Sequence, residues 1–157
     1  MRTAIDTNLL FDLRLRDDQS MAARDLLAAS SANGSLAICP VVYAEFCVAL
    51  SEQQEVDEML EVLAIHVEPF SPESLWVASR AWMRYLRTRG SQVQCPDCGE
   101  RFDTACPRCG AQATWRQRVI ADFLIGGHAV TQADHLITRD AGYFRTYFPE
   151  LRLTTPG

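Results

Sequence analysis

Lysine is absent from this chain of 157 residues, so all 15 of its basic side chains are arginines. A run of about 18 apolar residues is also missing, and we therefore expect no membrane-spanning helix. The amino terminus lacks the basic, apolar and small-residue regions of a signal peptide, which predicts a cytoplasmic protein. Neither a GxGxxG nor a GxxxxGK pattern occurs, so the readings as a dinucleotide-binding or nucleoside-triphosphate-binding protein lose their main support.

The arginines are unevenly distributed in an acidic chain. The formal net charge is −5, yet the segment from Arg80 to Arg118 contains eight arginines and only three acidic residues. Arginine binds phosphate through two parallel hydrogen bonds and also stacks on bases. A phosphate-binding segment is therefore favoured over the alternative, a solvated face in a chain that uses arginine in place of lysine.

Short apolar segments alternate with helical patterns along the chain. Hydrophobic residues make up 48% of the sequence, which is enough to build the core of one domain. Strands are expected at residues 3–5, 36–38, 65–70, 135–138 and 151–153. Helices are expected after caps at Asn8 and Ser20, from Pro40 towards Leu50, from Ser51, from Pro72, over 119–130 and over 141–148. This alternation predicts an α/β fold with a parallel sheet.

Three patterns predict how these helices pack. The acidic residues between Glu52 and Glu61 are expected to form a solvated face. The pair Gly126-Gly127 predicts close packing of its helix against the sheet. An apolar face at helical spacing, with both of its tryptophans in the core, is predicted for Leu75, Trp76, Ala78, Trp82 and Leu86.

Four carboxylates lie in apolar surroundings, at Asp6, Glu45, Asp122 and Asp140. A buried charge is costly unless it is paired or coordinates a metal ion. Asp6 and Asp140 each follow a predicted strand, and ligands bind at that edge of a parallel sheet. We therefore expect one acidic pocket for hard divalent cations, which Glu45 and Asp122 reach from flanking helices.

Four of the six cysteines form two C-P-x-C-G motifs within CPDCGERFDTACPRCG. This spacing is typical of tetrahedral zinc and is favoured here over disulfides or an iron–sulfur cluster. Four thiolates leave no open position on the metal, so the zinc is predicted to be structural. The expected zinc ribbon is an insertion at residues 91–114, with ligands Cys95, Cys98, Cys106 and Cys109. Cys39 and Cys47 are expected to be small core residues.

Four segments together resemble the PIN domain of VapC-type toxins. They are AIDTNLLF at the start, the Pro-x-x-Tyr-x-Glu pattern from Pro40 to Glu45, ADFLIGGHA at 121–129, and LITRDAGYFRTYFPEL near the end. The resemblance covers nearly the whole chain except the cysteine-rich insertion. It implies a single PIN-like domain over residues 1–157, folded as a three-layer α/β/α sandwich around a short parallel sheet.

The resemblance also implies an activity and its partners. The expected function is that of an Mg²⁺- or Mn²⁺-dependent endoribonuclease, acting as the toxin of a type II toxin–antitoxin pair. The expected partners are RNA, a small antitoxin protein and a second copy of the chain. The catalytic, metal-binding residues would be Asp6, Glu45, Asp122 and Asp140, supported by Thr7, Asn8 and Thr138. The RNA-binding candidates are Arg80, Arg84, Arg87, Arg108 and Arg116.

The cysteine-rich insertion departs from most toxins of this kind and leaves two alternatives open. One is a PIN-type RNA-processing nuclease that is not a toxin. The other is a non-catalytic zinc-ribbon module that binds RNA or protein. A phosphatase-like hydrolase is disfavoured because no DxD pair follows the first strand. His66 is expected to be a packing residue in its strand. His128 and His135 could be metal ligands or bases, but they are left out of the mechanism because two-metal phosphodiester hydrolysis needs no histidine base.

Overall fold

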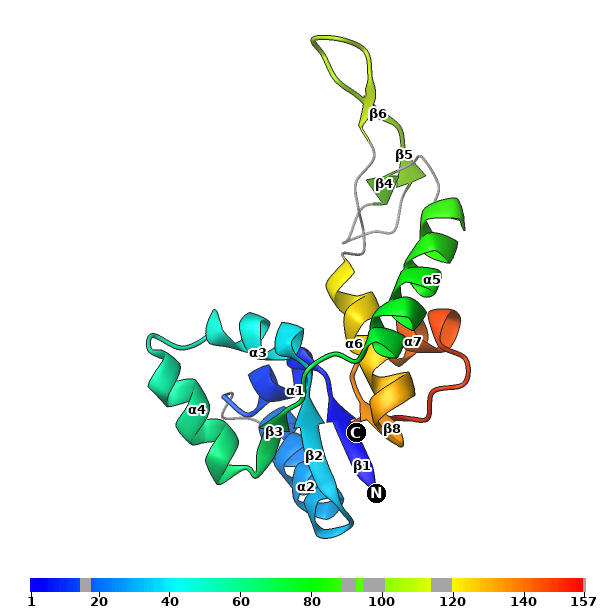
Figure 1. Cartoon of the computed structure of the whole chain (residues 1–157). Coiled ribbons are helices and arrows are strands. Elements are labelled where there is room, and N and C mark those ends of the chain that lie inside the picture. Colours follow the sequence, from blue (N-terminus) through cyan, green and yellow to red (C-terminus); the bar gives the residue numbers. More distant parts are fainter. Residues whose placement is uncertain (15–17, 89–92, 95–100, 114–119, 157) are drawn as a thin grey trace.

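A five-stranded parallel sheet lies at the centre of the computed structural model, which describes residues 1–14, 18–88, 93–94, 101–113 and 120–156 (Figure 1). The strand order is β3-β2-β1-β8-β9. The strands are β1 (Arg2–Ile5), β2 (Ser35–Ile38), β3 (Ile65–Val67), β8 (His135–Ile137) and β9 (Leu153–Thr154). All five predicted strands are therefore present, although β3 ends at Val67 and not at residue 70.

Two groups of helices lie on either side of this sheet, with α1–α4 on one side and α5–α7 on the other (Figure 1). Their bounds are α1 (Thr7–Asp12), α2 (Asp18–Ala32), α3 (Pro40–Cys47), α4 (Gln53–Val62), α5 (Pro72–Thr88), α6 (Ile120–Gln132) and α7 (Ala141–Tyr147). The predicted α/β/α arrangement is confirmed. The inner strands are short and apolar, with Ile5, Ile38 and Ile137 all at most 1% exposed, as expected for parallel strands covered on both faces.

The order of the strands creates a switch point beside β1. The chain runs from β1 to β2 to β3 in one direction, and then crosses back to β8 on the other side of β1. Ligands bind in open α/β sheets at the carboxyl ends of strands where the order reverses in this way. The carboxyl ends of β1 and β8 are therefore the place to look for a site.

Two predicted helix caps are wrong. α1 begins at Thr7, and its N-cap is Asp6, whose carboxylate accepts a hydrogen bond from the Thr7 amide. Ser20 does not cap α2, which begins at Asp18 and buries Ser20. In both cases an acidic residue earlier in the chain occupies the first turn or the cap, where a negative charge faces unpaired amides.

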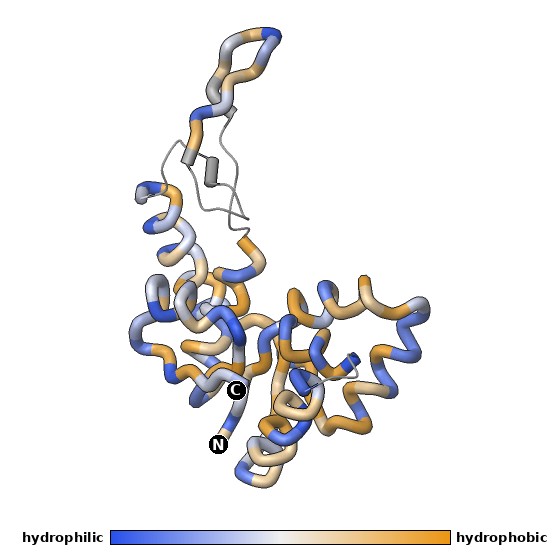
Figure 2. The backbone as a smooth tube through the Cα atoms, turned by 180° about the vertical axis from the view of Figure 1, so that it is seen from behind, coloured by the Kyte–Doolittle hydropathy of each residue, from blue (hydrophilic) through white to orange (hydrophobic). Residues whose placement is uncertain are grey.

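The acidic run on α4 forms the predicted solvated face. Glu55, Glu58 and Glu61 are exposed, whereas Leu60 is buried and Met59 is partly buried against the core. In Figure 2 the turns of α4 alternate between hydrophilic and hydrophobic residues. The helix is therefore held by one apolar stripe.

The predicted apolar face of α5 is confirmed only in part: Ala78 is buried and Trp82 packs against the core, whereas Leu75, Trp76 and Leu86 are exposed. The residues that α5 buries are the small side chains of Ser74, Ala78 and Ala81, together with Tyr85. Trp76 is 61% exposed. Trp82 is partly buried, and its ring centroid lies 5.0 Å from that of Phe123 on α6. Helical spacing alone could not select the buried face, because both sides of α5 carry apolar residues.

The reason for this choice of face is the close approach of α5 to α6 at Gly127. A Cβ atom placed on Gly127 would lie 2.4 Å from the backbone oxygen of Ser74 and 2.9 Å from the Cβ of Ala78. Gly126 faces the ring of Phe148 in the same way, at 2.2 Å. The glycine pair itself therefore packs against α5 and Phe148, while α6 as a whole also contacts β1 and β8 of the sheet.

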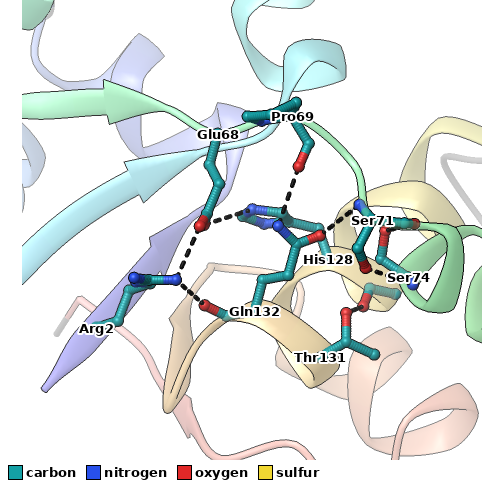
Figure 3. A network of polar contacts seen from close by, with 9 residues as sticks. Arg2, Glu68, Pro69, Ser71, Ser74, His128, Thr131 and Gln132 are labelled. Atoms are coloured by element: carbon teal, nitrogen blue, oxygen red, sulfur yellow. Dashed lines mark hydrogen bonds and ion pairs between the residues drawn. The ribbon is translucent and has the colours of Figure 1, made fainter.

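A polar network joins the start of β1 to α6 and to the segment that follows β3 (Figure 3). Glu68 Oε1 accepts a hydrogen bond from Arg2 Nη1 at 2.8 Å, and Glu68 Oε2 lies 3.2 Å from Nε2 of the buried His128. Gln132 accepts from the Ser71 amide at 2.9 Å and donates to the Pro69 carbonyl at 3.0 Å. Burial lowers the pKa of His128, while the charge of Glu68 opposes that shift. The network therefore satisfies polar groups that the crossover to α5 buries.

The described part of the segment between α5 and α6 lies away from the sheet (Figure 1). It contains two antiparallel strand pairs, β4 (Val93–Gln94) with β5 (Arg101–Phe102), and β6 (Thr104–Ala105) with β7 (Gln112–Ala113). Among all helices in the described ranges, α5 included, none is long and apolar enough to cross a membrane.

The close contact at Gly127 generates a test of the fold. We expect Gly127→Ala to lower the free energy of unfolding by about 2 kcal/mol, because overpacking against the α5 backbone outweighs the gain in helix propensity. The measurement is urea unfolding followed by circular dichroism.

The matched control is Gly142→Ala on α7, where a new Cβ would meet no atom within 4 Å. This variant should gain up to about 1 kcal/mol from helix propensity. Equal stabilities for the two variants would contradict the packing described for α5 and α6.

Candidate functional site

Asp6 lies at the carboxyl end of β1, where the strand order reverses. Its Oδ1 accepts the Thr7 amide at 2.8 Å. Its Oδ2 accepts Asn8 Nδ2 at 2.7 Å and the Thr138 hydroxyl at 2.6 Å. The residue is only 7% exposed. Three donors from α1 and from the end of β8 therefore fix the orientation of this carboxylate.

Burial is the main influence on the charge of Asp6. It raises the pKa of the carboxyl above its ordinary value of 3.8. Hydrogen bonds from Thr138, Thr7 and Asn8 lower that pKa, and the negative charge of Glu45 raises it. The protonated form of Asp6 is thus favoured in the fold. Protonated Asp6 contributes its full stabilisation below the unfolded-state pKa, and this stabilisation is lost as pH rises through the folded-state pKa. A cation bound nearby would favour the ionised form instead.

The other three carboxylates come from three separate helices. Glu45 on α3 accepts a short hydrogen bond from the Thr7 hydroxyl. Asp122 lies in the first turn of α6. Asp140 is the N-cap of α7; its Oδ1 accepts the Tyr143 amide at 3.3 Å, and its own amide donates to Thr138 Oγ1 at 3.0 Å. Thr138 therefore links two of the acids directly.

All four carboxylates line one pocket of about 450 Å³. Its polar residues were predicted from the sequence, whereas its apolar ones were not. The lining consists of Asp6, Thr7, Asn8, Phe11, Glu45, Val48, Asp122, Asp140 and Phe144. Across the described ranges, no three His, Cys, Asp or Glu residues stand close enough together to form a ready-made metal site. The four acids share a pocket, and their assignment as metal ligands stays a prediction.

An ion pair behind the pocket was not predicted from the sequence. Arg139 Nε lies 2.5 Å from Asp12 Oδ2, at the end of α1. The Arg139 amide donates to Asn8 Oδ1 at 3.2 Å, which leaves Asn8 Nδ2 free to turn towards Asp6. Since 127 residues separate Asp12 from Arg139, no local pattern could have predicted the pair.

The histidines do not belong to the pocket lining. His128 is buried against Glu68, and His135 Nε2 lies 3.4 Å from Thr3 Oγ1. His66 is exposed on β3, so its predicted packing role is wrong. This arrangement agrees with leaving all three out of the mechanism.

The predicted zinc ligands fall in two places. Cys95 and Cys98 lie outside the described residues, as does Arg116. Cys106 and Cys109 lie in a tight turn in which the Gly110 amide donates to the Cys106 carbonyl at 2.8 Å and Gly110 has a φ of 71°. Backbone amides of Cys109 and Arg108 donate to the Cys106 sulfur and lower its pKa. The turn thus favours a thiolate, the form that binds metal.

The remaining arginine candidates lie away from the acidic pocket. Arg80, Arg84 and Arg87 are exposed on α5, and Arg108 is exposed in the cysteine turn. None of these four contributes to the lining of the pocket. If these arginines bind RNA, they therefore contact it outside the pocket, on the protein surface.

The hydrogen bond from Thr138 to Asp6 generates a prediction. We expect Thr138→Val to raise the pKa of Asp6 further and to lower the free energy of unfolding by about 1–3 kcal/mol, because a buried carboxylate loses a donor and the Asp140 amide loses its acceptor. Carbon-13 NMR titration of the aspartate carboxyls and urea unfolding measure the two effects.

Thr138→Ser is the control, because it keeps the hydroxyl and should retain most of both properties. If the valine variant matched the wild type in Asp6 pKa, the hydrogen bond would not govern the charge of this carboxylate.

The fold of this chain is similar to that of several solved structures. VapBC2 from Rickettsia felis, bound to a promoter DNA fragment, matches with a TM-score of 0.62 at 16% identity, over 99% of this chain and 98% of the other. VapBC-1 from nontypeable Haemophilus influenzae matches with a TM-score of 0.61 at 17% identity, over 99% and 98%. FitAB bound to an IR36 DNA fragment matches with a TM-score of 0.59 at 16% identity, over 98% and 94%.

Sequence comparison gives the family. Among curated proteins, no sequence matches the chain. The PIN domain family model, in contrast, matches residues 3–149, from the strand that ends before Asp6 to the end of the helix that Asp140 caps. Since that match spans most of the chain and includes all four pocket carboxylates, the protein belongs to the PIN domain family.

Proposed function

We propose that this protein is an endoribonuclease that uses Mg²⁺ or Mn²⁺ to hydrolyse RNA phosphodiester bonds. The observation that carries the proposal is the convergence of Asp6, Glu45, Asp122 and Asp140 on one pocket at the switch point of a parallel sheet. Membership of the PIN family, whose members are typically nucleases, supports it.

The pocket suits a hard divalent cation. Its donors are carboxylate, hydroxyl and amide oxygens, which are the ligands that Mg²⁺ and Mn²⁺ prefer. Mg²⁺ usually keeps several waters and takes only one or two carboxylates, so the lack of a closed set of three ligands among the described residues does not conflict with it. The residues that would hold the ion are Asp6, Glu45, Asp122 and Asp140.

The chain contributes orientation and charge to this chemistry. Thr138, Thr7 and Asn8 hold the Asp6 carboxylate in a fixed direction, and the Thr7 hydroxyl holds Glu45 beside it. Phe11, Val48 and Phe144 form the apolar part of the wall beside the acids. When bound, the metal supplies Lewis-acid stabilisation of phosphate charge and a lowered pKa for an attacking water.

We also propose that the chain is the toxin of a toxin–antitoxin pair, acting in the cytoplasm as a homodimer. The fold neighbours are structures named VapBC and FitAB, which supports this context. The acidic pocket suits a small antitoxin that presents a basic side chain to it. Expression of the wild-type chain without its partner should arrest bacterial growth, and Asp6→Asn should abolish the arrest. Growth unaffected by an active nuclease would favour a PIN-type RNA-processing enzyme instead.

The test of the nuclease is cleavage of total RNA with and without Mg²⁺ or Mn²⁺. We expect metal-dependent cutting, and a decrease of about 100-fold or more in Asp6→Asn and in Asp122→Asn, because each removes charge that the transition state requires. Mapping of the cut ends would then identify the substrate RNA.

The matched control is Glu61→Gln, the same carboxylate-to-amide change on the exposed face of α4, which should cut at the wild-type rate. Wild-type rates in the Asp6 and Asp122 variants would exclude this pocket as the active site.

We further propose a structural zinc ion in the insertion, held by Cys95, Cys98, Cys106 and Cys109. The tight turn at Cys106–Gly110 and the lowered pKa of Cys106 support it. Elemental analysis of the purified chain should give one zinc per molecule, and Cys106→Ser or Cys109→Ser should lose it.

Cys47→Ser is the control for this site, because Cys47 packs against the core and should not affect the zinc content. Iron in place of zinc, or no metal at all, would contradict the assignment.

A further inference from the structure

The exposed face of α5 carries a row of one tryptophan and three arginines. Trp76, Arg80, Arg84 and Arg87 are spaced by four, four and three residues, which places them on one side of the helix. All four are exposed. The opposite side of α5 packs on α6 through small residues. We call these four residues the Trp76 row.

Trp76 contributes little to the core. It is 61% exposed, and the Arg80 guanidinium carbon lies 4.3 Å from the centre of its ring. A single exposed apolar residue is common on protein surfaces. A tryptophan stacked against an arginine is more specific, because the two planar groups together form a surface on which a base can stack.

Within the described residues, the contacts of the row's arginines are with neutral groups. In the described part of the chain, none of the three forms an ion pair with a carboxylate. Arg84 Nη2 donates to the Tyr147 carbonyl at 2.6 Å, and Arg87 Nη2 lies 3.5 Å from Met83 Sδ. The one acid nearby on α5 is Glu73, in its first turn. The row is therefore a local concentration of positive charge in a chain of net charge −5.

We propose that the Trp76 row binds single-stranded RNA, with a base stacked on Trp76 and with phosphates held by Arg80, Arg84 and Arg87. The proposal rests on the proposed ribonuclease function and names the form of its substrate. Single-stranded RNA is preferred because its bases can splay out onto an aromatic ring, whereas the bases of a duplex are stacked on each other. Positive charge along the same face complements the phosphate backbone.

The two ends of the row lie at different places along α6. Arg84 and Arg87 lie towards the start of α6, which carries Asp122, whereas Trp76 lies on the turn of α5 that packs beside Gly127. The rings of Trp82 and Tyr85 on α5 pack 5.0 and 5.6 Å from that of Phe123, the residue after Asp122. Trp76 precedes Trp82 by six residues, which is about 9 Å along a helix. Figure 1 shows α5 and α6 side by side along their length. The arginine end of the row is therefore the end nearer to the first turn of α6.

The test uses the full chain with Asp6→Asn, so that the RNA stays intact, and fluorescence anisotropy of a labelled single-stranded RNA of mixed sequence. Changing Trp76 to Leu should weaken binding by about 5- to 150-fold, because stacking on an aromatic ring is lost. Trp76→Phe keeps an aromatic face and should retain most of the affinity. The same RNA annealed to its complement should bind more weakly.

Salt dependence tests the phosphate contacts. Each of Arg80→Gln, Arg84→Gln and Arg87→Gln should reduce the slope of log affinity against log salt by about 0.7. Arg24→Gln is the matched control, because Arg24 is exposed on α2, in the other group of helices. Its slope should equal that of the parent.

Three results would overturn the proposal: equal affinity of the Leu and Phe variants at Trp76, equal affinity for duplex and single strand, or unchanged salt slopes. Loss of a dimer in sedimentation of Trp76→Leu with unchanged RNA affinity would make this face a protein interface instead. The cleavage assay tests the proposed nuclease activity separately from RNA binding by the Trp76 row. Cutting that persists in Asp6→Asn defeats the nuclease proposal, whereas cutting that depends on Asp6, together with unchanged binding in Trp76→Leu, defeats only the present one.

Discussion

The buried carboxylate of Asp6 connects the fold to the candidate site. Its three donors come from α1 and from Thr138 at the end of β8, so the same hydrogen bonds that satisfy this charge also hold α1 against the two central strands. Thr138 extends the connection to Asp140, and Thr7 extends it to Glu45. The Arg139 amide donates to Asn8 Oδ1, and the Arg139 side chain pairs with Asp12. Burial of the Asp6 carboxylate costs free energy, and its pKa is raised for this reason. A divalent cation bound beside Asp6 would offset that cost.

The contact between α5 and α6 has consequences on both sides of α5. Because a Cβ at Gly127 would meet the backbone of Ser74, α5 can turn only small residues towards α6 at this point. Its larger side chains must lie elsewhere, and Trp76 consequently faces solvent beside Arg80. The same close packing brings Phe123 against Trp82 and Tyr85, and so positions the first turn of α6 with Asp122 at the pocket. One close approach between two helices therefore shapes both the acidic pocket and the surface proposed to bind RNA.

Two different metal chemistries are proposed for two separate parts of the chain. Oxygen donors line the pocket at the edge of the sheet, whereas the proposed sulfur donors come from the part of the sequence between α5 and α6. Hard cations prefer the first set and zinc prefers the second. Backbone amides in the tight turn at Cys106 lower the pKa of its thiol, and the Asp6 carboxylate accepts hydrogen bonds from one amide and two side chains. Both sites rely on neutral donors to stabilise negative ligands.

The sequence determined the order and kind of the elements and the identity of the four acids. Apolar strands that end in Asp6 and Asp140 indicate a parallel sheet with a site at its edge, because a carboxylate in such surroundings is costly without a partner or a metal ion. The family resemblance added the expected activity, and the PIN family match agrees with it. Only the tertiary structure decided which face of α5 is buried, that Asp6 and not Asn8 caps α1, and that Arg139 pairs with Asp12. The buried face of α5 and the Arg139–Asp12 pair depend on contacts between residues far apart in the chain, and on how closely two backbones approach, which local spacing and composition do not encode. The cap of α1 is a local contact between Asp6 and the Thr7 amide, and the sequence offered both Asp6 and Asn8 for it.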